Sequence, residues 1–299
     1  MDDNRVVTRD WENDINPYIV VYKHTHQIDL PAVDIKVMSW NISGLNCSPI
    51  MLQGILQTIA EVTPAIIMLQ EVSRLQVDAL RERFDSLYAF HIADADAQHT
   101  CILGARCPGV LSQVRYRRFP NTADSRGMFT ATFTFSGKSV RLVTTHLESG
   151  AQAHGVRCEQ FAEVLAEDAH ILAGDFNIRD TEIQQNILDR NWHDSWIVSG
   201  QDETRRYTWD AHKNSRIPTS FFSKPRFRFD RCFVRKDDAF HILDFTLITS
   251  KFQETFPSDH FALVVSLRLR WRLLETWYTY PGALGQLTLW HATSRARSL

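Results

Sequence analysis

The sequence has few of the features that mark a disulfide-rich, membrane-spanning or strongly charged protein. Its 299 residues include 5 cysteines, scattered and without a CxxC pair, so it predicts neither a disulfide framework nor a zinc site. No stretch approaches the roughly 20 apolar residues of a membrane helix, and the polar first residues contain no apolar signal-peptide core. With a net charge of −2, any nucleic-acid binding must depend on local patches. We therefore expect a soluble intracellular protein.

Short apolar runs and helical spacings alternate along most of the chain. The composition, 44% hydrophobic and 23% charged, is sufficient for a sizeable core. The patterns predict helices at 50–61, 77–84 and 157–167, a hairpin at 131–144, and strands at 35–40, 65–69, 169–173, 227–234 and 261–269. Because hairpin and crossover connections both occur, we expect an α/β sandwich with mixed sheets rather than a doubly wound sheet.

No linker or low-complexity segment interrupts residues 34–269, which we interpret as one domain. Residues 1–33 form an N-terminal extension with one predicted strand at 18–23. Residues 270–299 form an aromatic-rich C-terminal tail. Three interpretations of the tail stay open: packing on the domain, binding a partner, or a poorly constrained extension. Its aromatic residues are Trp271, Trp277, Tyr278, Tyr280 and Trp290.

Four polar segments lie at the ends of predicted strands, at 40–45, 69–72, 174–177 and 258–260, the last of which precedes its strand. The end of a strand is where an open sheet presents groups to a ligand. Each segment alone is equally consistent with an ordinary turn or cap, since Asp and Asn favour such positions. Together they contain the groups that hydrolysis of a phosphodiester requires.

The first requirement is a hard divalent cation. Mg²⁺ is typically held by one or two carboxylates together with waters and a phosphate oxygen. The carboxylates of Glu71 and Asp259 and the amide oxygen of Asn41 are the candidate ligands.

The second requirement is stabilisation of charge at phosphorus and activation of water. His146, His260 and Asn177 are the candidate donors to the phosphate. Asp175 is the candidate carboxylate that orients or deprotonates the attacking water.

The order of these groups along the chain resembles the endonuclease/exonuclease/phosphatase superfamily. Finer matches resemble its type-2 tyrosyl-DNA phosphodiesterase branch, and the resemblance covers about 34–269. The matching segments are 40–45, 146–149 (His-Leu-Glu-Ser), 177–180 (Asn-Ile-Arg-Asp), 207–215, 228–231 and 256–260.

The resemblance implies a four-layered α/β (α+β) sandwich, in which helices flank two mixed β-sheets, as in deoxyribonuclease I. It implies a Mg²⁺-dependent phosphodiesterase, with Mn²⁺ as an alternative ion, that cleaves 5′-phosphotyrosyl bonds at DNA ends during repair. Glu71 then binds the metal, with help from Asn41 and Asp259. Asp230 orients His260, since a carboxylate on one ring nitrogen fixes the direction of the other.

The resemblance also implies the residues that contact the substrate. Ser149 with His146 holds phosphate oxygens, Arg179 binds near the 5′ phosphate, and Arg126 is an arginine of a lid loop. Trp209, Ile217 and Phe229 form an apolar wall for the bases, whereas the alternation of 227–234 leaves open whether Phe227 belongs to the core or contacts DNA. By analogy the substrate is a single-stranded 5′ overhang, the protein a monomer, and its compartment the nucleus or the cytoplasm.

Ser43 departs from the pattern because relatives often have an aspartate there, so one carboxylate near the metal is missing. A second hypothesis keeps the fold and changes the substrate, to an abasic-site endonuclease, a general nuclease, or a phosphatase of RNA, lipid or inositol. A third is a non-catalytic scaffold, which the presence of Glu71, Asp175 and His260 argues against.

Overall fold

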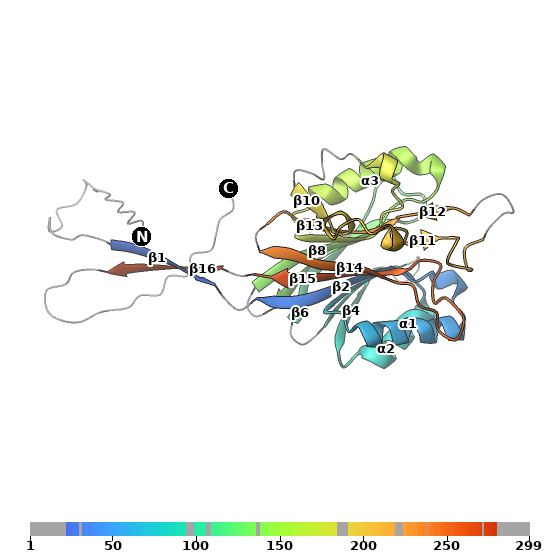
Figure 1. Cartoon of the computed structure of the whole chain (residues 1–299), viewed down its shortest axis with the longest axis horizontal. Helices are drawn as coiled ribbons and strands as arrows, with labels where there is room; N and C mark the ends of the chain where they lie inside the picture. The colour runs from blue at the N-terminus through green and yellow to red at the C-terminus, as the bar shows by residue number, and fades with distance from the viewer. Residues whose placement is uncertain are drawn as a thin grey trace. The chain divides into compact units, whose positions relative to one another are not determined.

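Two six-stranded β-sheets form the centre of the protein, seen in a computed structural model (Figure 1). The described residues are 22–29, 32–93, 99–105, 109–135, 138–183, 191–218, 224–237, 239–270 and 272–279. They fall into two units: Val33–Leu269, which holds both large sheets, and a second unit built from the two terminal segments.

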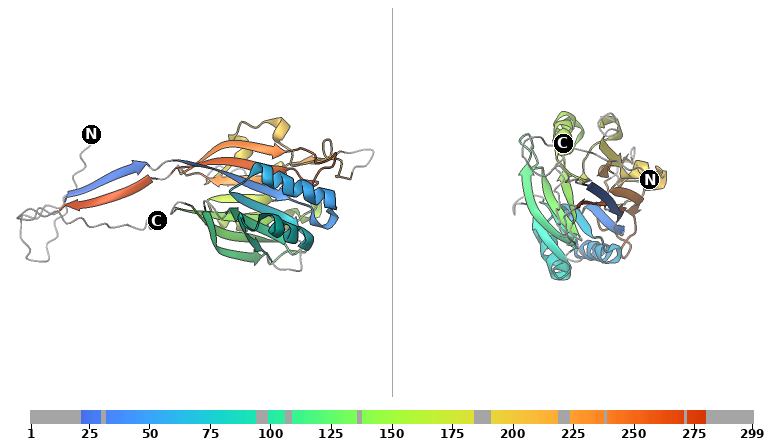
Figure 2. Two further views of the ribbon diagram at one scale, coloured as in Figure 1. Left: turned by 90° about the horizontal axis from the view of Figure 1, so that it is seen from below. Right: turned by 90° about the vertical axis from the view of Figure 1, so that its left-hand side faces the viewer.

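The first sheet has the strand order β14-β15-β2-β3-β5-β4, and only its central pair, β2 with β3, is parallel. Two helices cover its outer face, α1 (Pro49–Val62) and α2 (Arg74–Phe84), drawn in blue and teal in Figure 2. The strands are β2 (Val33–Asn41), β3 (Ile66–Val72), β4 (Tyr88–Ile92), β5 (His99–Ala105), β14 (Phe240–Ile248) and β15 (Ala262–Leu269).

The second sheet has the order β10-β13-β9-β8-β7-β6, and its one parallel pair is β8 with β9. Helix α3 (His154–Ala166) covers the outer face. The strands are β6 (Gly109–Arg118), β7 (Gly127–Phe135), β8 (Lys138–His146), β9 (Ile171–Asp175), β10 (Trp192–Asp194) and β13 (Asp230–Arg235). The remaining short elements of this unit are α5 (Ser195–Val198), β11 (Trp209–Asp210), β12 (Arg226–Phe227) and 3₁₀ turns at Gly44–Asn46, Ala151–Ala153, Asp180–Glu182 and Glu203–Arg205.

The layers are therefore helices, sheet, sheet and helix, so the predicted sandwich of two mixed sheets is confirmed (Figure 1). One core cluster packs α1 and α2 on the first sheet, through residues such as Ile55 and Ile59. Another packs Phe161 and Val164 of α3 on the second sheet. Helix α1 begins where the Ser48 hydroxyl accepts the Met51 N–H, which satisfies one of the free donors of its first turn.

The two parallel pairs meet where the sheets face each other, since β9 contacts both β2 and β3. Asn41 ends β2, His146 ends β8 and Asp175 ends β9, while Glu71 lies near the end of β3. Parallel neighbours end at the same edge of a sheet. The fold thus brings four of the predicted polar groups to one edge.

The predicted strand at 227–234 is wrong in its extent and its alternation. Residues 226 and 227 belong to β12, residues 228 and 229 lie outside any strand, and β13 starts at Asp230 with its first five residues all buried. The interruption has an electrostatic cause: Arg228 turns inward and forms two hydrogen bonds with Asp194, at 2.8 and 2.7 Å.

Most of the other predicted elements overlap observed ones, with shifted ends. The predicted strand at 169–173, for example, is β9, which starts two residues later and continues to Asp175. Strands β4, β5, β6, β10 and β14 were not expected from the sequence.

The terminal unit contains a two-stranded antiparallel sheet of β1 (Tyr22–Asp29) and β16 (Arg272–Thr279). Its register runs from Tyr22 opposite Thr279 to Asp29 opposite Arg272. The strand expected at 18–23 overlaps β1 only at its end, because 18–21 lie outside the described residues. Trp277 and Tyr278 of the tail lie in β16, whereas the tail's other three aromatic residues lie outside the described part of the chain.

Within the described residues, no helix is both long enough and apolar enough to cross a membrane.

Gly174 shows why the segment before Asp175 contains a glycine. It is paired with Thr145 of the parallel neighbour β8, and a Cβ at Gly174 would overlap the Thr145 carbonyl. Gly155 in α3 is a matched control, since a Cβ there would meet nothing within 4 Å.

We expect Gly174→Ala to lower the free energy of unfolding by about 1–3 kcal/mol, because backbone must shift to admit the methyl group. Gly155→Ala should raise it, by up to about 1 kcal/mol, through helix propensity. Urea denaturation of both variants measures this. Equal stability of Gly174→Ala and the parent would contradict the close contact between β8 and β9.

Candidate active site

Side chains from both sheets converge on the carboxylate of Asp175. Asn41 Nδ2 donates a hydrogen bond to Asp175 Oδ2 at 2.9 Å. His146 Nε2 lies 3.4 Å from the same oxygen and 3.8 Å from Glu71 Oε1. The backbone N–H of Asn177 donates to Asp175 Oδ1 at 2.9 Å. Five of the predicted site residues therefore form one connected cluster.

The backbone is left-handed at three residues of this edge. The φ angles are 50° at Ser43, 52° at Glu71 and 49° at Asn177. Such a conformation costs of order 1–3 kcal/mol for a residue with a side chain, and it persists where surrounding contacts impose it. At Glu71 it coincides with a register shift between β3 and β5. Other described residues, such as Thr63 and Gln253, also have positive φ, so this backbone conformation accompanies the polar edge but does not by itself mark it as a functional site.

His260 and Asp230 form a buried pair, with Nδ1 and Oδ2 2.7 Å apart. The other ring nitrogen, Nε2, lies 3.8 Å from Asp175 Oδ2. Burial alone lowers the pKa of His260, but the charges of Asp230 and Asp175 outweigh it and raise the pKa well above its ordinary value. The imidazole is therefore a cation whose free N–H points toward Asp175.

His146 has the opposite charge state. Arg126 Nη1 lies 2.6 Å from His146 Nδ1, and a guanidinium can only donate, so Nδ1 accepts and Nε2 carries the proton. Burial, followed by the charges of Arg126 and His260, holds the pKa of His146 well below its ordinary value. The site thus has one neutral and one charged histidine, each presenting an N–H near Asp175. Environments that separate the charge states of like groups are typical of acid–base sites.

Asp175 itself is almost fully buried. Burial and the neighbouring charge of Asp230 raise its pKa to about 6, against the lowering effects of His260, Asn41 and the Asn177 N–H. A carboxylate with a pKa near neutrality is suited to accept a proton from water.

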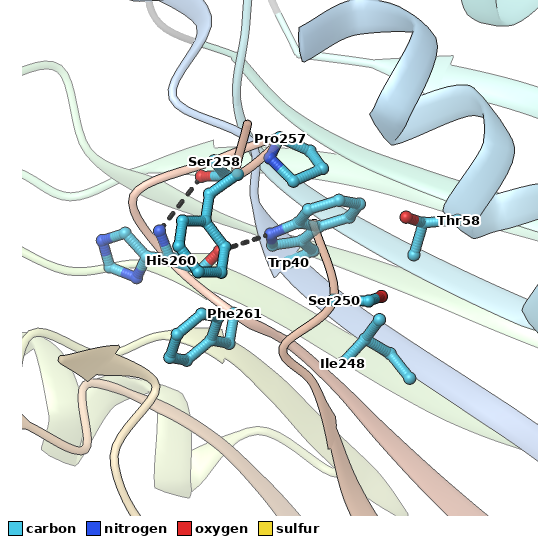
Figure 3. Close-up of a pocket in the computed structure, with 9 residues that line it drawn as sticks. Trp40, Thr58, Ile248, Ser250, Pro257, Ser258, His260 and Phe261 are labelled. Atoms are coloured by element: carbon cyan, nitrogen blue, oxygen red, sulfur yellow. Dashed lines mark hydrogen bonds between the residues drawn. The ribbon is translucent and has the colours of Figure 1, made fainter. Parts of the chain in front are cut away.

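The loop that carries His260 is fixed to the end of β2 (Figure 3). Trp40 Nε1 donates to the His260 carbonyl at 3.0 Å. The Ser258 hydroxyl donates to the Asn41 carbonyl at 2.7 Å. The His260 N–H in turn donates to Ser258 Oγ at 3.1 Å. The imidazole points away from Thr58, and the hollow beneath it is too small for a water molecule. This packing holds the histidine in place and is not a ligand site.

Asp259 lies beside the cluster and accepts hydrogen bonds from two sides. Trp209 Nε1 donates to its Oδ2 at 3.3 Å, and the Ser43 side chain also bonds to it. Burial raises the pKa of Asp259, but His260, Trp209 and Ser43 outweigh this and lower it. Ser43, which stands where relatives often have an aspartate, is therefore a partner of a predicted metal ligand.

Arg157 and Glu182 connect two loops that carry predicted substrate contacts. Arg157 is 1% exposed, and its Nη1 donates to the carbonyls on either side of Ser149, at 3.0 and 2.8 Å. Its Nη2 pairs with Glu182 Oε1 at 2.7 Å, and Glu182 Oε2 accepts the Arg179 N–H at 2.8 Å. The half-buried Ser149 and the exposed Arg179 are thus positioned by one ion pair.

Glu148 is a residue whose role the sequence did not indicate. Its buried carboxylate accepts hydrogen bonds from Thr122 Oγ1 at 2.8 Å and from the Asp124 N–H at 3.0 Å. Arg126 follows in the same loop, and its N–H donates to the Thr122 hydroxyl. Glu148 therefore holds the loop from which Arg126 reaches His146. The only available signal was its place in the segment 146–149.

Asp180 is a second such residue. Its carboxylate contacts Arg206 at 2.7 Å, Arg231 at 2.8 Å and Arg228 at 3.1 Å. Burial raises the pKa of Asp180, but these three arginines outweigh it and hold the pKa well below its ordinary value. The contacts with the three arginines hold Asp180, and with it the turn that follows Asn177, in place.

Two of the three residues of the predicted apolar wall lie together and are half-buried. The ring centroids of Trp209 and Phe229 are 5.9 Å apart. Ile217 differs, because it is 2% exposed and offers almost no surface to a ligand. Contact between Ile217 and DNA therefore stays a prediction, and the burial of this side chain does not support it.

A family model described as "Endonuclease/Exonuclease/phosphatase family" matches residues 38–260, which include strands of both sheets and every catalytic residue predicted above. The chain belongs to the endonuclease/exonuclease/phosphatase family. The superfamily assignment and the deoxyribonuclease-I-like fold are thus confirmed.

Relatives in this family include tyrosyl-DNA phosphodiesterases. The chain is 32% identical to tyrosyl-DNA phosphodiesterase 2 of Mus musculus over 250 residues, which are 79% of this chain and 66% of that protein. It is 29% identical to the 5′-tyrosyl-DNA phosphodiesterase of Caenorhabditis elegans, over 79% of this chain and 67% of that protein. The chain thus spans about two thirds of the length of these relatives.

Solved structures agree with this assignment. The Danio rerio tyrosyl-DNA phosphodiesterase 2, complexed with a single-strand DNA product, has a TM-score of 0.72 and 30% identity, covering 78% of this chain and 98% of that one. The catalytic domain of human Nocturnin, with a bound sulfate anion, has a TM-score of 0.63 at 20% identity over 81% of this chain and 96% of that one, and shows the fold alone.

The family is metal-dependent, and the donor set fits a cation. Asp175, Asp230 and His260 offer ligand atoms within 4.8 Å of one another. However, His260 is already paired with Asp230, and a hard cation prefers oxygen. Glu71, whose carboxylate lies beside His146, and the amide oxygen of Asn41 suit it better. The carboxylates of Asp175, Asp230 and Glu71 outnumber the one charged imidazole, that of His260, so this edge has negative charge left for a cation to offset.

The pair of Arg157 and Glu182 makes stability depend on pH in a defined direction. Burial raises the pKa of Glu182, but hydrogen bonds from Arg157, the Arg179 N–H and His154 outweigh it and lower the pKa from 4.5 to about 2. As pH falls, the Glu182 carboxylate takes up a proton in the unfolded chain before it does so in the folded one. The ionised carboxylate therefore makes its full contribution to the free energy of unfolding above pH 4.5, and this contribution is lost as pH falls toward 2.

We expect Glu182→Gln to be less stable than the parent, with a gap in the free energy of unfolding that narrows as pH falls below 4.5. Urea denaturation over a pH series measures it. Glu82→Gln, which changes an exposed glutamate of α2, is the control and should show no such trend. A gap that is constant with pH would contradict the proposed pair.

Proposed function

We propose that this chain is a Mg²⁺-dependent phosphodiesterase that hydrolyses 5′-phosphotyrosyl bonds at DNA ends. The observation that carries the proposal is the convergence of two histidines, whose Nε2 atoms lie 3.4 Å (His146) and 3.8 Å (His260) from the same oxygen of Asp175, beside Glu71. The family and the names of the relatives support the choice of substrate.

Glu71 would hold Mg²⁺, with Asn41 and Asp259 as the other candidate ligands and Mn²⁺ as an alternative ion. The amide nitrogen of Asn41 donates to Asp175, and its oxygen, which accepts the Ser43 N–H, keeps a second lone pair that a cation could use. A bound divalent ion supplies positive charge that polarises a phosphate oxygen and offsets the charge gained in the transition state.

The protein's own groups account for the remaining steps. Asp175 orients the attacking water and accepts its proton, which its pKa of about 6 permits. The charged N–H of His260 and the neutral N–H of His146 donate to the phosphate oxygens, with Asn177 beside them. The amide of Asn177 is fixed by its bond to the Leu147 carbonyl at 3.1 Å. Asp230 orients His260.

The DNA end is expected to lie between Arg179, Ser149 and the aromatic residues Trp209 and Phe229. A single-stranded 5′ overhang is the proposed form, in keeping with the single-strand product in the Danio rerio structure. Bases stack on aromatic rings without regard to sequence, which suits an enzyme of DNA repair. Monomeric state and a nuclear or cytoplasmic location stay predictions by analogy.

With Mg²⁺, the purified protein should release tyrosine from a 5′-phosphotyrosyl oligonucleotide, and EDTA should abolish release. Glu71→Ala or His260→Ala should reduce kcat/KM by several orders of magnitude, because each removes charge stabilisation at the reacting phosphate. Glu82→Gln is the control for a change of charge on the surface and should match the parent. Parental activity in Glu71→Ala would rule out the proposed metal site.

A panel of substrates separates this function from others in the family. We expect phosphotyrosyl DNA to be cleaved with a much higher kcat/KM than abasic duplex, unmodified RNA or a p-nitrophenyl phosphodiester. Cleavage of abasic duplex with no release of tyrosine would reject the substrate while leaving the phosphodiesterase chemistry intact. Loss of all activities, with normal folding, would favour a non-catalytic scaffold.

A further inference from the structure

Phe227 adds a third ring to the aromatic residues beside the site. We propose that Phe227 and Arg179 form a substrate-positioning pair. The pair binds an unpaired DNA strand beyond the nucleotide that carries the reacting phosphate. This inference rests on the proposed function and identifies a residue that determines how single-stranded DNA is held. We call Trp209, Phe227 and Phe229 the aromatic wall.

The three rings contact one another. The centroids of Phe227 and Phe229 are 4.8 Å apart with an interplanar angle of 17°, and those of Phe227 and Trp209 are 6.0 Å apart at 28°. All three are half-buried, and Phe227 belongs to neither core cluster described above. Each of the three residues therefore keeps part of its surface exposed.

The backbone around Phe227 is held rigidly. Phe227 pairs with Trp209 in the ladder of β11 and β12, and the adjacent pair is Asp210 with Arg226. Arg226 Nη2 donates to Asp210 Oδ2 at 2.9 Å. A ring held in this way is preorganised, so less entropy is lost when a ligand stacks on it.

Arg228, which lies between the two phenylalanines in the sequence, is buried. Its guanidinium bonds to both oxygens of Asp194 in the interior. Phe227 and Phe229, the residues before and after Arg228, are instead half-buried and stack on each other. The ion pair of Arg228 with Asp194 thus anchors the chain between these two rings of the wall.

Arg179 brings a positive charge to the same ring. Its guanidinium carbon lies 5.4 Å from the centroid of Phe227, within the range of a cation–π contact, and the residue is exposed. Its N–H is fixed by Glu182. A phosphate bound by the guanidinium would therefore lie close to the ring.

An unpaired strand matches this combination. Its bases offer free faces to an aromatic ring, and each stacked base contributes roughly 1–3 kcal/mol, whereas bases within a duplex are already stacked on their neighbours. The phosphate that follows a stacked base is the group a guanidinium binds best. The ligand class is therefore single-stranded DNA, held through a base and its phosphate.

The test is the dependence of KM on strand length. Parent and Phe227→Ala are compared on single-stranded 5′-phosphotyrosyl substrates from one nucleotide upward. We expect the ratio of the two KM values to rise with length to about tenfold. The reason is that Trp209 bonds to Asp259 beside the site, whereas Phe227 meets the wall at the next ring, 6.0 Å from Trp209. Phe227→Trp should restore the parental KM. Phe90→Ala, which truncates a half-buried phenylalanine of β4 in the other sheet, should give a ratio that does not vary with length.

A double-mutant cycle with Arg179→Ala tests the pair. If the ring and the guanidinium act together, the double variant should raise KM by less than the product of the two single effects. Additive effects, or a KM ratio for Phe227→Ala that is the same at every length, would overturn the inference.

Fluorescence anisotropy with unmodified single-stranded DNA and no metal separates this inference from the proposed function. Weaker binding by Phe227→Ala together with no tyrosine release by the parent would reject the function and keep the positioning role. Tyrosine release by the parent together with equal binding and equal KM in both proteins would keep the function and reject the role of Phe227.

Discussion

The site depends on two carboxylates that are buried side by side. Asp175 and Asp230 are directly paired in neighbouring strands, and both are about 1% exposed. Burial and, after it, the charge of Asp230 raise the pKa of Asp175, and one cation, the imidazolium of His260, opposes this shift. Because an unpaired buried charge is strongly destabilising, this arrangement requires His260 to stay within reach of both. The strand end, the loop of His260 and the charge of the histidine are therefore coupled.

Charged networks outside the cluster hold the substrate side in place. Arg157 with Glu182 links the loop of Ser149 to that of Arg179, and Glu148 fixes the loop from which Arg126 reaches His146. Arg157, Glu182 and Glu148 contact no reacting atom in the proposed mechanism. Their effect is to fix the rotamer and the charge state of groups that do, which is how outer residues commonly support a catalytic site.

A buried ion pair also accompanies the arrangement of the aromatic wall. Arg228 bonds to Asp194 in the interior, whereas its two neighbours, Phe227 and Phe229, stack on each other. This ion pair thus anchors the chain between two of the rings that a DNA strand would meet. The wall and the catalytic cluster are connected through Trp209, which contacts both Phe229 and Asp259.

The sequence by itself determined the elements with strong periodicity, such as α1, β3 and α3. It also determined the polar residues that end β2, β8 and β9, because spacing and residue chemistry are local properties. It also carried the order of motifs by which the family resemblance was found. Only the tertiary structure decided the opposite charge states of His146 and His260, the strain at Glu71, the break after Phe227 and the burial of Ile217. Each of these depends on a partner distant in sequence, such as Arg126 for His146 or Asp194 for Arg228, and the sequence alone does not show which distant groups meet.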